Sequence, residues 1–332
     1  MIIKSKIHPV TWMVWSASAS VAALLTRNPW YLLLLSLLAF LIRWRATMVR
    51  PGGWSVRLYF SFLTIPAFMN LIFSRAGDTV LLELPIKWIG GPYTLEALLF
   101  GVSAGIQIAT LLTVMMVFSD VVTPQDLLRR TPAGLYPAGI TASIGLSFIP
   151  RAQRAFTSLR EAQQIRGYKT KGIRDLPKLV TPLVILTLEQ SISIAESLVS
   201  RGWGVAGMGG WKRWAVIAGL TSLAAGLAVV VLFSGQPILP TGLIVLGVLG
   251  VILGLRTEEL GNRYRPEKWQ LKDSIVVGSA IGVALVYLGL SVTAPVMLSF
   301  YPYPRISAPN FDWPLFFAMG ILSTPFWMMK DD

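Results

Sequence analysis

Two arginine–glycine pairs are the residues of this sequence whose types and spacing most clearly suggest a chemical role. One pair closes the stretch EAQQIRG at 161–167, and the other closes SLVSRG at 197–202. The glycine is a natural C-terminal cap of a helix, because it adopts a left-handed backbone at little cost. An arginine beside it is a forked donor suited to carboxylates and carbonyls of a partner. The pairs Arg166-Gly167 and Arg201-Gly202 therefore predict two points for docking another protein.

A simpler interpretation treats each pair as a helix cap and nothing more. The cation then complements the negative end of the helix dipole and reaches toward phosphate headgroups. Docking is favoured here because the pair occurs twice, at the ends of two consecutive amphipathic helices. The small glycine also allows a partner to approach the backbone closely.

A second set of charged residues lies within the same two helices. Glu189 and Glu196 are seven residues apart and share one face of a helix. A catalytic pair of carboxylates would need a polar cleft and a partner acid or base. We expect these two instead to pair with Arg151, Arg154 or another basic residue of the preceding helix and to brace the two helices.

Few residues of this sequence are of types that bind metal ions or cofactors. The chain has no cysteine and one histidine, His8, which excludes disulfides, thiolate metal sites and a site of several histidines. Asp120 and Asp126 flank Thr123-Pro124 and are expected to cap short helices rather than bind a metal. We expect no catalytic residue, no metal site and no cofactor.

The composition predicts an all-α polytopic membrane protein. Of 332 residues, 54% are hydrophobic and only 14% are charged, with a mean hydropathy of +0.63. A soluble domain has about 25% charged residues. The net charge of +13 indicates cytoplasmic loops with anionic lipid or protein partners. Nucleic acid is not an expected partner.

Apolar segments suggest about eight transmembrane helices, the first two short. The clearest spans lack Asp, Glu, Lys and Arg, and two shorter ones are added at 58–74 and 313–329. The clear spans are Ala97–Ser119, Trp214–Ser234, Pro237–Leu255 and Ser274–Ser299. The N-terminal zone Trp12–Ile42 is interrupted at Arg27-Asn28-Pro29, so it is either a thin hairpin or one kinked helix. Basic residues on both of its flanks favour the hairpin.

Positive charge assigns residues 120–213 to the cytoplasm. Between 151 and 178 there are eight basic and two acidic residues. The apolar run Leu179–Ser200 is long enough to span, but it contains two glutamates and is followed by further basic residues. We therefore assign it to a long helix of this cytoplasmic region, packed beneath or obliquely within the bundle. A helix before it is expected to start at Pro150 and end at Gly167. Both termini are predicted to be cytoplasmic, in a multi-pass protein of the cell membrane.

The chain resembles the transmembrane (T) component of energy-coupling factor (ECF) transporters, the CbiQ/EcfT family of ABC-type importers. The resemblance covers roughly residues 5–235 and rests on FIPRAQRAFTSLREAQQIRG at 148–167 and AESLVSRGWG at 195–204, supported by TPQDLLRRT at 123–131 and IHPVTW near the N-terminus. It implies that two cytoplasmic coupling helices end in X-Arg-X motifs that dock on a pair of cytosolic ABC ATPases, homodimeric or heterodimeric. The motifs would be Ile165-Arg166-Gly167 and Ser200-Arg201-Gly202. It also implies a membrane S component that captures a vitamin or a transition-metal ion.

The resemblance implies a division of the chain into four parts. These are N-terminal transmembrane helices (1–119), a coupling-helix region (120–213), a last family-like span (214–235) and a C-terminal transmembrane extension (236–332). The family pattern departs after Pro9, where a basic residue is common but Val10 and Thr11 follow here. The extension lies outside the resemblance, and either bracing of the bundle or replacement of an S-component contact would be consistent with it.

The function predicted is that of a non-catalytic coupling subunit. No G-x-x-x-x-G-K-[ST] motif is present, so ATP hydrolysis is expected on partner subunits. Two alternatives remain open. A membrane enzyme acting on lipid or isoprenoid substrates would need clustered Asp or His residues, and a self-sufficient channel or secondary transporter would need ionisable residues near mid-membrane or a repeat.

Overall fold

The computed structural model describes residues 7–47, 53–74, 76–84, 91–128, 136–167, 176–202, 210–232, 246–247, 250, 269–303 and 308–329. The chain divides into two compact units. The first comprises residues 1–123 and 265–332, and the second comprises residues 124–264. The first unit therefore combines the N-terminal helices with most of the C-terminal extension.

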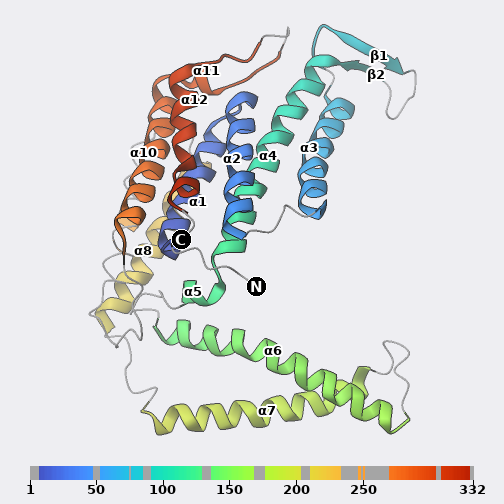
Figure 1. The fold of residues 1–332 in the computed structure, drawn as a ribbon, viewed down its shortest axis with the longest axis vertical. Helices are drawn as coiled ribbons and strands as arrows, with labels where there is room; N and C mark the ends of the chain where they lie inside the picture. The colour runs from blue at the N-terminus through green and yellow to red at the C-terminus, as the bar shows by residue number, and fades with distance from the viewer. Residues whose placement is uncertain are drawn as a thin grey trace. The chain divides into compact units, whose positions relative to one another are not determined.

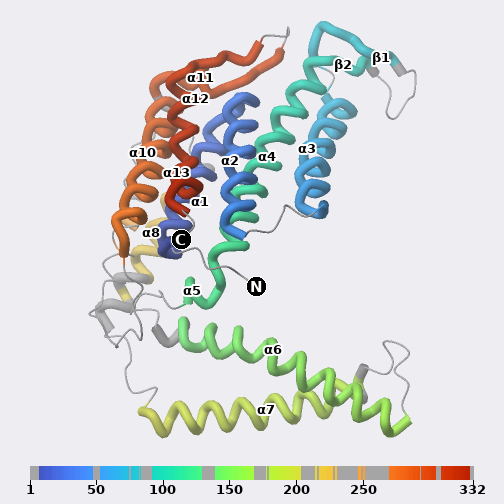
Figure 2. Tube along the Cα trace, in the orientation of Figure 1, coloured from blue at the N-terminus to red at the C-terminus, as the bar shows by residue number. Residues whose placement is uncertain are grey.

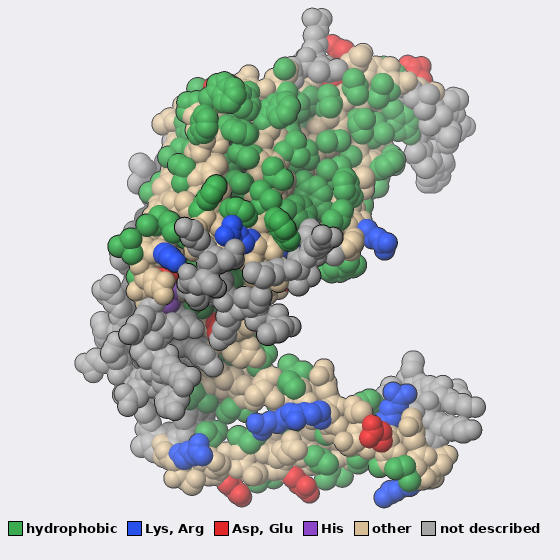
Figure 3. Space-filling view, in the orientation of Figure 1, with side chains coloured by type: hydrophobic (Ala, Val, Ile, Leu, Met, Phe, Trp, Pro, Cys, Tyr) green, Lys and Arg blue, Asp and Glu red, His purple; other side chains and the backbone are tan. Residues whose placement is uncertain are grey.

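The first unit is a bundle of apolar helices (Figures 1 and 2). Its elements are α1 (Pro9–Leu25), α2 (Pro29–Thr47), α3 (Gly53–Phe73), α4 (Leu95–Val121), α10 (Leu271–Thr293), α11 (Pro295–Leu298), α12 (Trp313–Gly320), the 3-10 turn Ile321–Ser323 and α13 (Thr324–Met328). Hydrophobic side chains cover most of its visible face (Figure 3). That surface is expected of helices that face lipid instead of water.

The N-terminal apolar zone forms two helices, as the charge pattern favoured. Residues Thr26–Asn28 separate α1 from α2, and the Thr26 backbone is extended. At one end of the unit, the start of α1 is bonded to Asp273 of α10 and the end of α2 to Met329, which follows α13. At the other end, the turn at residues 26–31 is bonded to Leu298, Asn310 and Asp312. The zone is thus a hairpin and not a single kinked helix.

Helices α3 and α4 approach each other along a glycine face. A Cβ at Gly101 would lie 2.8 Å from Ala67 Cα, and one at Gly105 would lie 2.4 Å from the carbonyl oxygen of Leu63. Small residues four apart let helix backbones meet closely in membranes. Among the described residues of α3, only Ser55 and Ala67 are buried. The packing of α3 therefore depends mainly on this contact with α4.

The C-terminal helices contact α1 and α2 through a series of polar bonds. At one end Asp273 Oδ1 accepts from the His8 backbone and from Thr11 Oγ1, and Arg45 Nε donates to the Met329 carbonyl. Between the ends, Trp15 Nε1 donates to the Leu322 carbonyl. The described C-terminal helices from α10 to α13 are therefore part of the same core as the N-terminal helices.

The segment between the apolar stretches at 58–74 and 97–119 contains a small sheet. Strands β1 (Val80–Leu84) and β2 (Gly91–Thr94) pair antiparallel, with a register shift between Val80 and Leu82. Buried Glu96 fastens the approach to this hairpin by accepting bonds from the Thr79 backbone and hydroxyl.

The second unit contains α5 (Pro124–Leu128), α6 (Tyr136–Ile165), α7 (Leu176–Ser200) and α8 (Gly210–Leu232). The predicted start of a helix at Pro150 is wrong, because α6 begins fourteen residues earlier and runs through this proline. Because proline has no backbone N–H, α6 lacks one helical hydrogen bond at this position. The short helix predicted near Pro124 is present as α5.

Five described helices are long and apolar enough to cross a membrane. They are Pro29–Thr47, Gly53–Phe73, Leu95–Val121, Leu179–Ser200 and Leu271–Ser291, and shorter apolar helices occur at Pro9–Leu25, Ile217–Gly226 and Trp313–Met328. The chain is therefore an all-α polytopic membrane protein. The predicted span Pro237–Leu255 falls almost wholly outside the described residues, and the cytoplasmic assignment of Leu179–Ser200 stays a prediction based on charge.

Candidate functional site

Helices α6 and α7 cross each other and run in opposite directions (Figure 1). Each is long: α6 has 30 residues and α7 has 25. At about 1.5 Å per residue these lengths correspond to about 45 Å and about 37 Å. The antiparallel arrangement separates their C-terminal ends, so that the two arginine–glycine pairs lie at opposite ends of the helix pair.

The end of α6 is a glycine-capped tip. Gly167 has φ of +82°, and its amide donates to the Gln164 carbonyl at 2.9 Å. The Arg166 amide still donates to the Ala162 carbonyl at 3.2 Å, so the helical turn reaches the arginine. Ile165 is 88% exposed, and Arg166 is exposed as well. An apolar side chain and a cation thus project together from one helix end.

The end of α7 repeats this geometry. Gly202 has φ of +75°, and its amide donates to the Val199 carbonyl at 2.9 Å. The Arg201 amide donates to the Leu198 carbonyl at 3.1 Å, and Ser200 Oγ donates to the Ser197 carbonyl. Arg201 is exposed and Val199 is 70% exposed. Among the described residues, no atom lies within 4 Å of a Cβ built at Gly167 or Gly202, so this part of the chain leaves both tips open to a partner.

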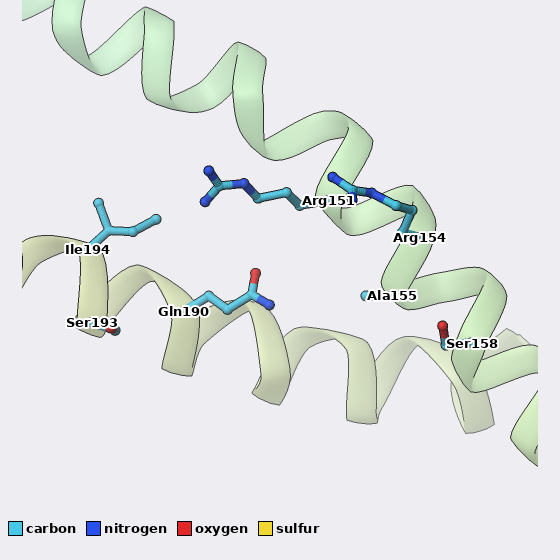
Figure 4. Close-up of a pocket in the computed structure, with 7 residues that line it drawn as sticks. All are labelled: Arg151, Arg154, Ala155, Ser158, Gln190, Ser193 and Ile194. Atoms are coloured by element: carbon cyan, nitrogen blue, oxygen red, sulfur yellow. The ribbon is translucent and has the colours of Figure 1, made fainter.

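The other arginines of interest line a pocket between the two helices (Figure 4). Its volume is about 600 Å³. Arg151, Arg154, Ala155 and Ser158 line it from α6, and Gln190, Ser193 and Ile194 line it from α7. Figure 4 shows the Arg151 side chain extending between the helices, over Gln190 and Ile194. Arg154 Nε donates to the Pro150 carbonyl at 3.2 Å.

The expected ion pairs between the helices are not formed in this structure. No ion pair joins Glu189 or Glu196 to Arg151 or Arg154, all four of which lie in the described part of the chain. The reason is rotation of α7. Its face toward α6 is centred on Gln190, Ser193 and Ile194, and both glutamates lie about 100° around the helix from that centre. The two glutamates do share a face, but it is a different one.

Two polar arrangements were missed by the sequence analysis. The lining residues Ser158, Gln190 and Ser193 recur at helical spacing on facing sides of α6 and α7, a pattern that is visible in the sequence once the pairing of these helices is known. Asp120, which was expected to cap a helix, instead lies 2.6 Å from Arg43 Nε and joins α4 to α2. Its partner lies 77 residues away, so local spacing contained no sign of it.

Catalytic and metal chemistry is not apparent at the described residues. Within those parts of the chain, no group of three or more His, Cys, Asp or Glu residues is placed to hold a metal ion. The features that stand out are the two exposed tips and the basic pocket between their helices. Both suit binding to another molecule.

Comparison with known proteins gives one family match. The model of the CbiQ family, described as cobalt transport protein, matches residues 3–208. No curated protein matches the chain. The match includes α1–α7 and both tips, and it ends before α8. An all-α bundle with several apolar helices and a match over more than half its length identify this chain as a member of the CbiQ family, the family of ECF transporter T components.

Proposed function

We propose that this protein is the transmembrane coupling subunit of an ECF-type importer. In this role it passes ATP-driven motion of cytosolic ABC ATPases to a membrane S component that captures a vitamin or a transition-metal ion. Membership of a transport family supports a transport-related membrane subunit. The observation on which the finer proposal rests is the pair of exposed, glycine-capped arginine tips at opposite ends of α6 and α7.

The placement of the tips suits a pair of ATPases. One tip is available to each ATPase, because the antiparallel helices point their C-terminal ends away from each other. When two ATPases close around ATP, their docking grooves move relative to each other. A helix pair held at both tips would convert that movement into a change of its crossing angle. In this mechanism α6 and α7 act as levers, and the arginines are docking residues and not catalysts.

The chemistry of each tip suits a protein groove. Arginine is enriched among the residues that contribute most to interface energies, above all where neighbouring contacts exclude water. Each tip also carries an exposed aliphatic residue, Ile165 on α6 and Val199 on α7. Docking would bury that residue and desolvate the guanidinium, and the glycine would admit the groove wall close to the backbone. The contacting residues proposed are those of the two motifs, Ile165, Arg166, Gly167, Ser200, Arg201 and Gly202, together with Val199 beside the second motif.

The division of labour follows from what the sequence contains. Since it has no phosphate-binding loop motif, ATP hydrolysis is assigned to the partner subunits. The S component is assigned the choice of substrate. We place the ATPases on the cytoplasmic side together with both chain termini, as the distribution of Lys and Arg predicts.

Copurification tests the proposal directly. The tagged protein is coexpressed with candidate ABC ATPases from its source organism and purified in detergent, as wild type and as Arg166→Glu/Arg201→Glu. Truncating one partner of a buried charged contact costs roughly 2–5 kcal/mol, so a single reversal should weaken copurification and the double reversal should abolish it. Arg160→Glu is the matched control, because Arg160 is exposed on α6 but lies before the tip.

Two results would reject the proposal. One is copurification of ATPases with wild type and the double variant in equal amounts. The other is a loss of ATPase with Arg160→Glu as large as that with Arg166→Glu, which would indicate a general charge effect. Failure of wild type to bind any ATPase would reopen the channel and membrane-enzyme alternatives.

A further inference from the structure

The pocket between α6 and α7 has the lining of an anion site. Two of its seven lining side chains are guanidinium groups, and three more are the neutral hydrogen-bonding groups of Ser158, Gln190 and Ser193. No carboxylate is among them. Neither arginine forms an ion pair with a described residue, because the glutamates of α7 face another direction. The positive charge in the pocket is therefore not balanced by the helices that form it.

The spacing of these side chains brings the donors together. On α6 Arg151, Arg154 and Ser158 follow one another at intervals of three and four, so they share one face. On α7 Gln190 and Ser193 are three residues apart and face that side. The contact between Arg154 Nε and the Pro150 carbonyl uses one of the five N–H donors of this guanidinium and fixes its direction. Its terminal nitrogens remain available.

The number of donors selects among anions. A carboxylate has two oxygens and is satisfied by one guanidinium fork. A phosphate group offers three or more oxygens, which match two forks together with hydroxyl and amide donors. The pocket is an open groove of about 600 Å³, which leaves room for a phosphate group, and Arg151 and Arg154 in its lining are exposed to solvent.

We propose that the pocket lined by Arg151 and Arg154 binds a phosphate group, either on an anionic phospholipid headgroup or as a soluble phosphate. This site shares no residue with the arginine tips, so it goes beyond the coupling role and does not depend on it. Occupancy would place an anion between the two helices and favour one crossing geometry over others.

Binding measurements on the full-length protein in detergent test the site. Native mass spectrometry follows titration with dioctanoyl phosphatidylglycerol, and dioctanoyl phosphatidylcholine serves as the headgroup without net charge. Inorganic phosphate is titrated separately and observed by phosphorus NMR line broadening. We expect a phosphate-bearing ligand to bind more weakly as NaCl is raised, because the contact is made by exposed charges.

Three variants isolate the pocket. Arg151→Gln/Arg154→Gln should weaken binding about 25-fold, at roughly fivefold for each cation removed from near an anionic group. Gln190→Glu should weaken it too while keeping both arginines, because it introduces a carboxylate opposite them. Arg160→Gln removes one exposed charge outside the pocket and should change binding less than twofold.

Each outcome decides the question. Arginine-dependent binding of phosphatidylglycerol but not phosphatidylcholine supports a lipid headgroup. Arginine-dependent binding of inorganic phosphate supports a soluble ligand. Equal affinity of wild type and the double Gln variant, or an equal loss with Arg160→Gln, overturns the proposal. Because ATPase copurification by the double Gln variant can be measured in parallel, failure of this site is distinguishable from failure of the docking tips.

Discussion

Replacement of Asp273 tests whether the C-terminal helices are part of the membrane core. This carboxylate is 1% exposed and forms bonds at two helix starts. Oδ1 accepts from the His8 backbone at 2.9 Å and from Thr11 Oγ1 at 3.0 Å, which anchors the first turn of α1. Oδ2 accepts from the Gln270 backbone at 2.9 Å and caps α10 itself. One side chain thus joins the N-terminal hairpin to the extension.

The expected cost follows from the bonds lost. Hydrogen bonds to charged groups contribute roughly 1.5–3 kcal/mol each. Asp273→Asn keeps one acceptor oxygen but loses the charge and the second acceptor, so we expect about 2–4 kcal/mol of destabilisation. A change of 1 kcal/mol shifts the melting temperature of a large domain by about 2 °C. The variant should therefore unfold about 4–8 °C below wild type.

The measurement is thermal unfolding of the purified protein in detergent, followed by intrinsic fluorescence. Glu83→Gln is the control, because it removes the same charge from an exposed position on β1. Surface substitutions usually change stability by less than about 0.5 kcal/mol. If Asp273→Asn melts within 1–2 °C, roughly the spread of the control, the carboxylate does not join the two parts as argued.

Three further predictions concern other contacts. Gly105→Ala should lower the free energy of unfolding by about 1–3 kcal/mol, because the added Cβ would overlap a backbone carbonyl of α3. Gly145→Ala, on the open surface of α6, should be neutral or stabilising. Thermal unfolding of both variants distinguishes the two sites. Arg45→Ala should lower the melting temperature more than Arg45→Lys. Lysine keeps a cation near the ring of Phe326, whose centroid lies 4.7 Å from Arg45 Cζ, and loses the bond from Nε to the Met329 carbonyl. Equal melting temperatures of the two variants would contradict this. Gly167→Ala and Gly202→Ala each place a side chain on a left-handed backbone, at a cost of roughly 1–2 kcal/mol. Each should therefore reduce ATPase copurification although both arginines remain. Copurification equal to that of Gly145→Ala would contradict the docking geometry.

Several features could be predicted from the sequence because they depend on local pattern. The helix ends at Gly167 and Gly202 follow from one residue type with a known backbone preference, and both have positive φ. The break at Arg27-Asn28-Pro29 and the basic residues on both sides of it were sufficient to favour a hairpin. Composition alone was enough to indicate a membrane protein.

Other features depend on how helices meet, which local pattern does not contain. Pro150 was taken as a helix start because proline is common there, but Leu146 and its neighbours continue α6 in the N-terminal direction. The two glutamates of α7 were expected to face Arg151 or Arg154, and only the rotation of α7 decides that Gln190 faces them instead. A rotation of about 100° is one residue on a helix, so charge spacing could not distinguish these arrangements.

The C-terminal helices show most clearly what lies beyond a family pattern. The match ends at residue 208, yet Trp15, Tyr31 and Arg45 within it form polar contacts with the last helices of the chain. In an apolar environment such groups are costly without partners, so the matched N-terminal hairpin depends on residues outside the match. Of the roles left open for the extension, this contact pattern favours bracing. A hairpin tied at both ends should move with α10–α13 as one body. In the proposed coupling role, motion that begins at the tips of α6 and α7 would therefore displace that body as a whole and not bend it.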